Sequence, residues 1–286
     1  MRSGRSLIGV LTPALGILVL LRVVPLLYTF VLSFTDWSLA QSGGAAFIGT
    51  QNYVRLLQNP DFWQSLKVTT YFTVSATALE LVCGLAIALA LNHVRSGANA
   101  ALTTITVPML GTPVVVGALW RILYNADIGI LNQLLAGLGL AKIPWLGSTS
   151  VSLISIVLVD MWQWTSFMTL VLYAGLISLP AEPYEAAGLD GASWLQQQRF
   201  ITLPLLSQLM AIAVVLRAMD AFRTFDIVYV LTAGGPANST YLISLYIYDW
   251  AFKFLKLGMA GALSTVLLAF MAAVAVGVLR MGRRAV

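Results

Sequence analysis

Charged residues are scarce in this sequence. Asp, Glu, Lys and Arg make up 9% of its 286 residues, against about 25% in soluble domains. Hydrophobic residues make up 59%, and the mean hydropathy is +0.88. These values exclude a water-soluble domain and predict an integral membrane protein. The net charge of +5 comes from single Lys and Arg residues, many of them at the ends of apolar runs. That distribution is ordinary in membrane proteins, so we expect no nucleic-acid partner.

Histidine and cysteine occur once each, as His93 and Cys83. One residue of each kind gives no cluster of metal ligands. A lone cysteine in an apolar run forms no intrachain disulfide, and we expect a buried, inert thiol. The sequence also lacks the Gly-x-x-x-x-Gly-Lys-Ser/Thr phosphate loop and the Gly-x-Ser-x-Gly nucleophile elbow. We therefore expect no catalytic residues, no metal and no cofactor in this chain.

Long apolar runs dominate what is present, and a bilayer-spanning helix needs about 20 such residues. We place six spans at residues 7–34, 66–91, 100–123, 151–179, 205–231 and 258–279. The predicted fold class is an all-α integral membrane protein, with residues 1–286 as one domain. Pro108 and Pro113 predict a local irregularity in the third span. The first run is too long for a signal peptide and lacks a small-residue cleavage site, so we expect it to stay uncleaved.

The orientation follows from arginines at the two chain ends, which are Arg2, Arg5, Arg280, Arg283 and Arg284. An even number of spans puts both ends on one side, and basic flanking residues favour the cytoplasm. Counted over the chain ends, the links and the span edges, seven basic residues fall on the inside and six on the outside. The prediction therefore depends on the arginines of the chain ends, which adjoin the first and last spans directly. It places the link between the fourth and fifth spans, residues 180–204, in the cytoplasm.

That cytoplasmic link is predicted to form two short helices at a bend. The local signals in chain order are Pro180 and Pro183 ending the span, helix formers over 184–189, a turn at Asp190-Gly191, an N-cap at Ser193, a second helix over 194–200, and entry to the next span at Leu203-Pro204. The residues alone leave two interpretations open. The link is either an ordinary amphipathic loop at the membrane interface or a docking surface for a partner.

The spacing within this link resembles a known signature. Glu-Ala-Ala is followed after three residues by Gly, and after nine more by Ile-x-Leu-Pro. The permease subunits of bacterial binding-protein-dependent ABC importers carry this pattern on their cytoplasmic side. The resemblance implies a coupling helix that seats in a cleft of a separate ATPase subunit. The residues assigned to this contact are Glu185, Ala186, Ala187, Gly188, Asp190, Gly191, Ile201, Leu203 and Pro204.

Further segments resemble the carbohydrate-type permeases of the same family. They are residues 33–37, 47–49 with Asn52-Tyr53, 129–132, and 225–226 with 229–236. The Thr-x-Gly-Gly-Pro element at 232–236 is typical of the maltose- or glycerol-phosphate-type first permease. The chain has no large extracytoplasmic insertion and no extra N-terminal spans, so it is similar to short six-span versions such as the trehalose type.

The resemblance implies a non-catalytic subunit of the bacterial inner membrane that forms half of a sugar pathway. Its implied partners are a second permease, two ATPase subunits (or a homodimer of one) that bind ATP and Mg²⁺, an extracytoplasmic solute-binding protein, the sugar itself and membrane lipid. A glycerol-phosphate-type or other polar solute is the alternative within the class. A membrane enzyme or scaffold, and a secondary transporter, are alternatives from other classes.

Polar residues inside two spans are candidates for the solute pathway. They are Asp160, Gln163 and Trp164 in the fourth span, and Arg217, Asp220, Arg223 and Asp226 in the fifth. Ionisable groups within a membrane usually face the bundle interior or a watery cavity. The three-residue steps predict that Arg217 pairs with Asp220 and Arg223 with Asp226. These residues either line the pathway or hold helices together. Glu80 and Arg22, in the second and first spans, are expected to pair with each other.

Overall fold

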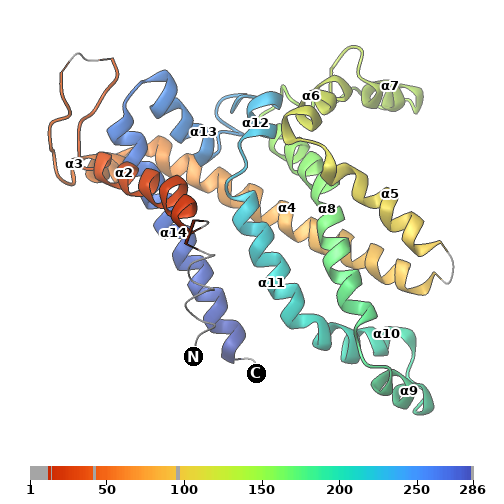
Figure 1. Ribbon diagram of the computed structural model, residues 1–286. Coiled ribbons are helices and arrows are strands. Elements are labelled where there is room, and N and C mark those ends of the chain that lie inside the picture. The colour runs from red at the N-terminus through yellow and green to blue at the C-terminus, as the bar shows by residue number, and fades with distance from the viewer. Residues whose placement is uncertain (1–11, 14, 41–42, 95–96, 285–286) are drawn as a thin grey trace, which may run out of the picture. The chain divides into compact units, whose positions relative to one another are not determined.

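The computed structural model describes residues 12–13, 15–40, 43–94 and 97–284, and these residues are almost entirely helical (Figure 1). The chain separates into two compact units. The first comprises Met1–Gln64 and Tyr246–Val274, and the second comprises Ser65–Leu245 and Ala275–Val286. Helices α4 (Pro60–His93), α13 (Ile243–Tyr248) and α14 (Leu257–Arg284) each contribute residues to both units.

Five helical stretches among the described residues are long and apolar enough to cross a membrane: Leu15–Leu32, Pro60–His93, Ser152–Ile177, Trp194–Ala221 and Leu257–Gly277. A sixth span results if α5 (Ala98–Leu110) and α6 (Pro113–Leu123) are counted together, although they meet at 93°. The predicted irregularity is this right-angle break. Proline disfavours a helical conformation in the residue before it, and Thr112 is extended, with φ −65° and ψ 139°.

The predicted fifth span, 205–231, differs from the structure at both ends. One continuous helix begins at Trp194 and runs through α10 (Trp194–Gln197), the π-helical turn η2 (Gln198–Thr202) and α11 (Leu203–Ala221). A proline inside an α-helix crowds the preceding turn, and the wider turn η2 ends two residues before Pro204. At the other end, α11 stops at Ala221 and a separate short helix, α12 (Asp226–Leu231), follows.

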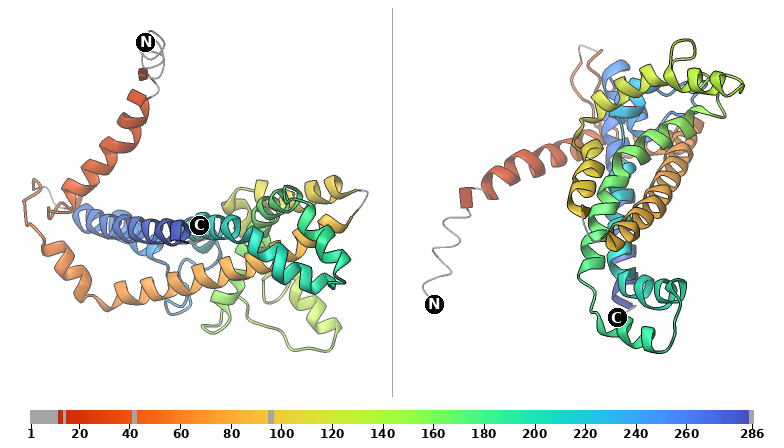
Figure 2. Two further views of the ribbon diagram at one scale, coloured as in Figure 1. Left: turned by 90° about the horizontal axis from the view of Figure 1, so that it is seen from below. Right: turned by 90° about the vertical axis from the view of Figure 1, so that its right-hand side faces the viewer.

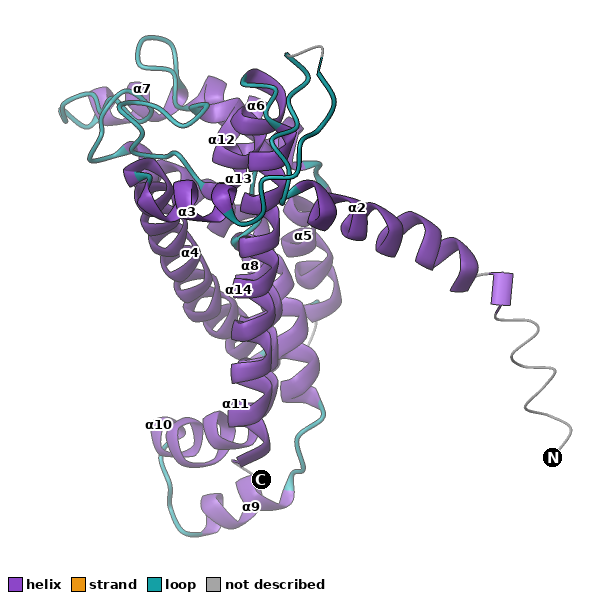
Figure 3. Ribbon diagram, turned by 90° about the vertical axis from the view of Figure 1, so that its left-hand side faces the viewer, coloured by secondary structure: helices purple, strands orange, loops and turns teal. Residues whose placement is uncertain are grey.

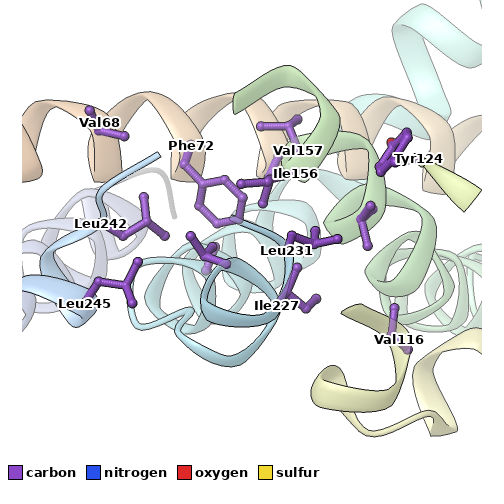
Figure 4. Packing of buried hydrophobic residues seen from close by; sticks show 14 residues of the cluster. Val68, Phe72, Val116, Tyr124, Ile156, Val157, Ile227, Leu231, Leu242 and Leu245 are labelled. Atoms are coloured by element: carbon purple, nitrogen blue, oxygen red, sulfur yellow. The ribbon is translucent and has the colours of Figure 1, made fainter. Parts of the chain in front are cut away.

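The second unit is built around α8 (Ser152–Ile177), which contacts α5, α6, α11 and α12. Its apolar core joins Phe72 of α4, Ile156 of α8 and Ile227 of α12 (Figure 4). Helices α4 and α8 approach each other closely at Gly84, where an added Cβ would lie 2.5 Å from the Cβ of Met168. Cys83, expected to be buried, is half-buried.

The first unit contains α2 (Val24–Leu32) with its preceding turn η1 (Val19–Val23), α3 (Gln51–Gln58) and η3 (Asp249–Lys253). Buried Asn52 holds its segments together, because its Nδ2 donates to the carbonyl oxygens of Ser33 at 2.9 Å and Thr35 at 2.7 Å. Tyr53 hydroxyl lies 2.6 Å from Ser33 Oγ. Ile48 N donates to Phe34 O at 2.8 Å. The segments 33–37, 47–49 and 52–53, which the resemblance singled out, therefore pack as one structure.

Candidate functional site

A buried charge cluster joins three helices of the second unit. Arg217 of α11 places its Nε 2.8 Å from Glu80 Oε2 and its Nη2 3.0 Å from Glu80 Oε1. The same Nη2 pairs with Asp160 Oδ2. Arg217 is 2% exposed, and both carboxylates are 0% exposed. The guanidinium carbon also lies 5.0 Å from the ring centre of Trp164. One buried guanidinium thus ties α4, α8 and α11 together.

The expected pairing of Glu80 with Arg22 is wrong. Glu80 pairs with Arg217, and Arg22 is exposed. A carboxylate in a membrane interior needs a cation or a hydrogen-bond donor, but the sequence offers several arginines. Helix packing, which the spacing along the chain does not reveal, decides which of them is near.

Asp220 connects this cluster to a more exposed guanidinium. Its Oδ2 accepts a hydrogen bond from Arg217 Nη1 at 3.3 Å, which confirms that predicted pair. Its Oδ1 accepts from Arg223 Nη2 at 3.4 Å. The predicted pair of Arg223 with Asp226 is wrong, because α11 ends at Ala221 and the helical three-residue spacing no longer applies beyond it.

A cavity of about 280 Å³ opens beside the cluster. Its lining residues come from α6, α8, α11, α12 and the turn between the last two: Pro113, Asp160, Trp164, Asp220, Arg223, Thr224, Phe225, Asp226 and Ile227. Five of the seven pathway candidates line it, and the structure therefore brings residues from two predicted spans to one place. Gln163 and Arg217 are not part of its lining.

Gln163 instead supports the break between α5 and α6. Its side chain is 0% exposed, and Nε2 donates to the carbonyl oxygen of Gly111 at 2.8 Å. A backbone carbonyl freed at a helix break inside a membrane needs such a partner. The break is adjacent to Pro113, which lines the cavity. Gln163 therefore helps to shape the cavity wall without contacting its interior.

The loop at the start of α10 is shaped mainly by its backbone. Helix α9 (Glu182–Leu189) is followed by Asp190 and then by Gly191, which has φ +76°. Gly191 N donates to the oxygen of Gly188, and Ala192 N donates to the oxygen of Ala187 at 2.9 Å. These two bonds form a Schellman motif, whose left-handed position glycine occupies without strain. The fixed glycine of the signature therefore has a local conformational cause.

Side chains then fix both short helices to their surroundings. Ser193 caps α10, since its Oγ accepts from Gln196 N and its own N–H donates to Gln196 Oε1 at 2.7 Å. Tyr184 of α9 shares a 2.9 Å hydrogen bond with Thr202 of η2. Trp194 Nε1 donates to His93 Nε2 at 3.1 Å, which links α10 to the end of α4. The loop therefore has a defined structure that is hydrogen-bonded to the end of α4 and to η2.

Most signature residues of this loop are accessible. Glu185, Ala186, Gly188, Asp190, Gly191 and Pro204 are exposed, and Ala187, Ile201 and Leu203 are half-buried. Large apolar side chains of the loop are also exposed: Leu189 at 91%, Leu195 at 71% and Phe200 at 69%. Reasoning from the sequence did not single out these three. Figures 2 and 3 show α9 and α10 at one end of α8 and α11, with α6, α7 (Ile130–Gly137) and α12 at the other.

Residues 80–282 match the family described as the inner membrane component of binding-protein-dependent transport systems. The chain belongs to this family. The match begins at the cluster residue Glu80, and it includes the cavity, the loop and most of α14. The protein is accordingly a multi-pass membrane permease component of an ABC transporter.

Two relatives of this permease are similar over nearly its whole length. A probable ABC transporter permease protein, y4oQ of Sinorhizobium fredii, is 40% identical over 263 residues, covering 92% of this chain and 85% of the relative. The trehalose/maltose transport system permease protein MalF of Thermococcus litoralis is 35% identical over 272 residues, covering 95% and 91%.

The permease fold also matches a solved structure. A chain of a bacterial ABC transporter involved in the import of the acidic polysaccharide alginate superposes with a TM-score of 0.86. The match covers 99% of this chain and 96% of that one, at 22% sequence identity. At this identity the comparison shows the shared fold.

The Thr-x-Gly-Gly-Pro element of this permease forms a compact turn after α12. Thr240 Oγ1 lies 2.7 Å from Thr232 Oγ1 and donates to the oxygen of Gly235 at 2.8 Å. Gly234 has φ +92°, and an added Cβ there would meet the ring of Tyr241 at 2.5 Å. Ser239 joins the turn to Ser152 of α8 at 2.9 Å. This turn fixes the end of α12 that lies away from Asp226.

Proposed function

We propose that this permease forms half of the translocation pathway of an ATP-driven sugar importer. Its solute would be a mono-, di- or oligosaccharide or a sugar-like molecule. The name of the trehalose/maltose relative supports this substrate class. The cavity supports it as well, because it offers acceptors at Asp220 and Asp226, donors at Arg223, and an aromatic face at Trp164. Sugar sites combine a few oriented polar groups with ring surfaces.

One observation carries the proposed mechanism. The helix Trp194–Ala221 is unbroken from the capped start of α10 to the residue beside Asp220. The accessible loop lies at its beginning, and the charge cluster and cavity lie at its end. A partner that moves the loop therefore moves a rigid element that reaches the cavity. Such a connection can shift the equilibrium between inward- and outward-facing states.

The proposed partners follow from this arrangement. Two ATPase subunits would bind ATP and Mg²⁺. They would contact the loop at Glu185, Ala186, Ala187 and the residues around Gly191. A second permease would complete the pathway, and an extracytoplasmic solute-binding protein would deliver the sugar. The description of the family as binding-protein-dependent supports the second of these partners. This requires the loop and both chain ends to lie in the cytoplasm of a bacterium. Catalysis would belong to the ATPase, and this chain would be non-catalytic.

The test uses the assembled transporter in proteoliposomes with two loop variants, Glu185→Ala and Gly191→Val. We expect both to insert and assemble, but to lose the stimulation of ATP hydrolysis by the solute-binding protein. Glu185→Ala removes a charge that orients the partner. Gly191→Val distorts the turn, since a β-branched residue at positive φ is strained. Normal transport by both variants would show that the loop assignment is wrong.

Gly139 provides a matched control for Gly191. It has φ +74°, and, as at Gly191, an added Cβ would meet no atom within 4 Å. It also closes the same motif at the end of α7, with Leu140 N donating to Leu135 O at 2.9 Å. Gly139→Val therefore introduces the same backbone strain at the other end of the unit. We expect this variant to keep its ATPase stimulation. A loss as large as that of Gly191→Val would assign the effect to strain in general.

A further inference from the structure

Carboxylates outnumber guanidinium groups at the cavity. The cavity and the cluster beside it contain four carboxylates, Glu80, Asp160, Asp220 and Asp226, and two guanidinium groups, Arg217 and Arg223. The residues that line the cavity itself include three carboxylates, Asp160, Asp220 and Asp226, and one guanidinium, Arg223. Acidic groups therefore predominate in its wall.

Both guanidinium groups beside the cavity already have carboxylate partners. Arg217 is 2% exposed and is already shared among Glu80, Asp160 and Asp220. Arg223 lines the cavity but lies 3.4 Å from Asp220 Oδ1. The basic residue on neighbouring α6 is Arg121, and its Nη1 donates at 3.1 Å to the oxygen of Val230, well along α12 from Asp226. Asp226 makes no ion pair within the described part of the chain.

The same groups suit the hydroxyls of an uncharged solute. Asp220 and Asp226 line the cavity and are accessible: the Asp220 side chain is 47% exposed, and Asp226 is exposed. A solute hydroxyl can therefore donate to either carboxylate. Ionised carboxylates accept hydrogen bonds only, so they match hydroxyl donors and repel phosphate, sulfonate and carboxylate groups. Trp164 and Phe225 supply apolar ring surface in the same wall.

We propose that this cavity admits uncharged polyhydroxylated solutes and rejects anionic ones, with Asp220 and Asp226 setting this preference. The proposal rests on the proposed function and deepens it, because it separates a neutral sugar from the glycerol-phosphate type of solute. Asp226 is the sharper test residue, since its charge can be removed without breaking an ion pair. Asp220 also supports Arg217, so its replacement would change two things at once.

The experiment measures solute binding to the membrane complex purified through this chain, with the solute-binding protein removed. Tryptophan fluorescence reports binding. The part of the signal that is lost in Trp164→Phe comes from the cavity, because the other seven of this chain's eight tryptophans remain in that variant. The probes are pairs that differ by one phosphate: trehalose with trehalose 6-phosphate, and glucose with glucose 6-phosphate. We expect the neutral member to bind about tenfold more tightly, as repulsion between near charges predicts.

Variants then assign the preference to the cavity. The preference is the ratio of the Kd of a phosphorylated probe to the Kd of its neutral partner. Asp226→Asn should lower this ratio by about threefold, because one repelling charge is lost. The control Asp127→Asn removes an exposed carboxylate beyond the end of α6 and should leave the ratio unchanged. Equal or tighter binding of the phosphorylated probes, or an unchanged ratio in Asp226→Asn, would overturn the proposal. So would the absence of a Trp164-dependent signal with every probe.

These outcomes are separable from a failure of the proposed function. The charge preference is read from solute binding alone, without ATP hydrolysis. The coupling role is read from ATPase stimulation in the loop variants. A transporter that couples normally but prefers phosphorylated sugars would refute only the charge preference. A chain that assembles with no ATPase would refute the importer itself.

Discussion

The two ends of the helix Trp194–Ala221 are held in opposite ways. At its end, Arg217 depends on Glu80, 137 positions away in the chain, and on Asp160, 57 positions away. At its beginning, Ser193 is paired with Gln196, and Gly191 with Gly188, both within three positions. The first end is a tertiary structure of buried charges, and the second is a local structure of backbone and caps.

This difference suggests that one end of the helix stabilises the fold and that the other end receives the movement of a partner. Buried charges are expensive unless they are paired, so the cluster end resists change and keeps α4, α8 and α11 in one arrangement. The loop end is accessible and carries little buried polar surface. A rigid element with one anchored end and one accessible end suits a subunit that another protein moves. Substitutions at the two ends should therefore differ in size and in kind.

The largest effect is expected for Arg217→Met. This change leaves Glu80 and Asp160 buried without their cation, which costs about 3–5 kcal/mol where such pairs have been broken. SDS titration of the purified permease, followed by circular dichroism, measures the free energy of unfolding. We expect a large loss of stability, partly restored when Glu80→Gln is added, since one uncompensated charge is then removed.

Arg223→Met is the matched control for Arg217. It removes the other guanidinium bonded to Asp220, but its side chain is 62% exposed. An exposed pair contributes about 0–1 kcal/mol. Equal losses for the two variants would mean that burial does not set the strength of this cluster, and the contrast between the two ends of the helix would fail.

The same contrast explains what sequence reasoning could predict. Features with a local cause were found: the turn at Gly191, the cap at Ser193, and the break before Pro113. Features with a tertiary cause were missed or misassigned. The predicted partner of Glu80 was Arg22, whereas the structure pairs Glu80 with Arg217. The end of α11 at Ala221 was also missed, because no proline or glycine follows it directly. That end is instead accompanied by Ser244 Oγ donating to Thr224 O at 2.5 Å.

The cavity shows the same limit. The sequence left open whether the polar residues of the fourth and fifth predicted spans line a pathway or hold helices together, and five of them line one cavity. The sequence could not distinguish these five residues from Gln163, which donates a hydrogen bond to Gly111, or from Arg217, which is buried and does not line the cavity. Residue type indicates that a group needs a polar partner. Only the packing of α5, α6 and α8 shows which partner it has.

An intermediate effect is expected for Gly84→Ala. The added Cβ would lie 2.5 Å from Met168 Cβ and 3.0 Å from Thr169 N, so α4 and α8 must move apart. Overpacking of this kind costs about 1–3 kcal/mol. Gly188→Ala, in α9 at the loop end, meets nothing within 4 Å and should be neutral or slightly stabilising, because alanine favours helix. The SDS titration compares both; equal stability of the two variants would show that the α4–α8 contact is not tight.

The smallest effect is expected for Ser193→Ala at the loop end. Losing an N-cap costs about 1 kcal/mol, and here it removes the hydroxyl that accepts from Gln196 N. The loss should stay local, because α10 continues into η2 and α11, which are held by Tyr184 and by the packing of α8. Hydrogen exchange should therefore rise for the amides of residues 194–197, while the midpoint of global unfolding stays within error.

Ser193→Thr is the matched variant for this cap, since threonine keeps the accepting oxygen. It should retain the slow exchange of the parent protein. Faster exchange spreading along α11 to Arg217 in Ser193→Ala would contradict the picture of a locally determined loop. It would mean that the cap and the buried cluster stabilise each other through the helix. The two ends would then form one cooperative unit, and the loop could not be altered without loosening the cavity.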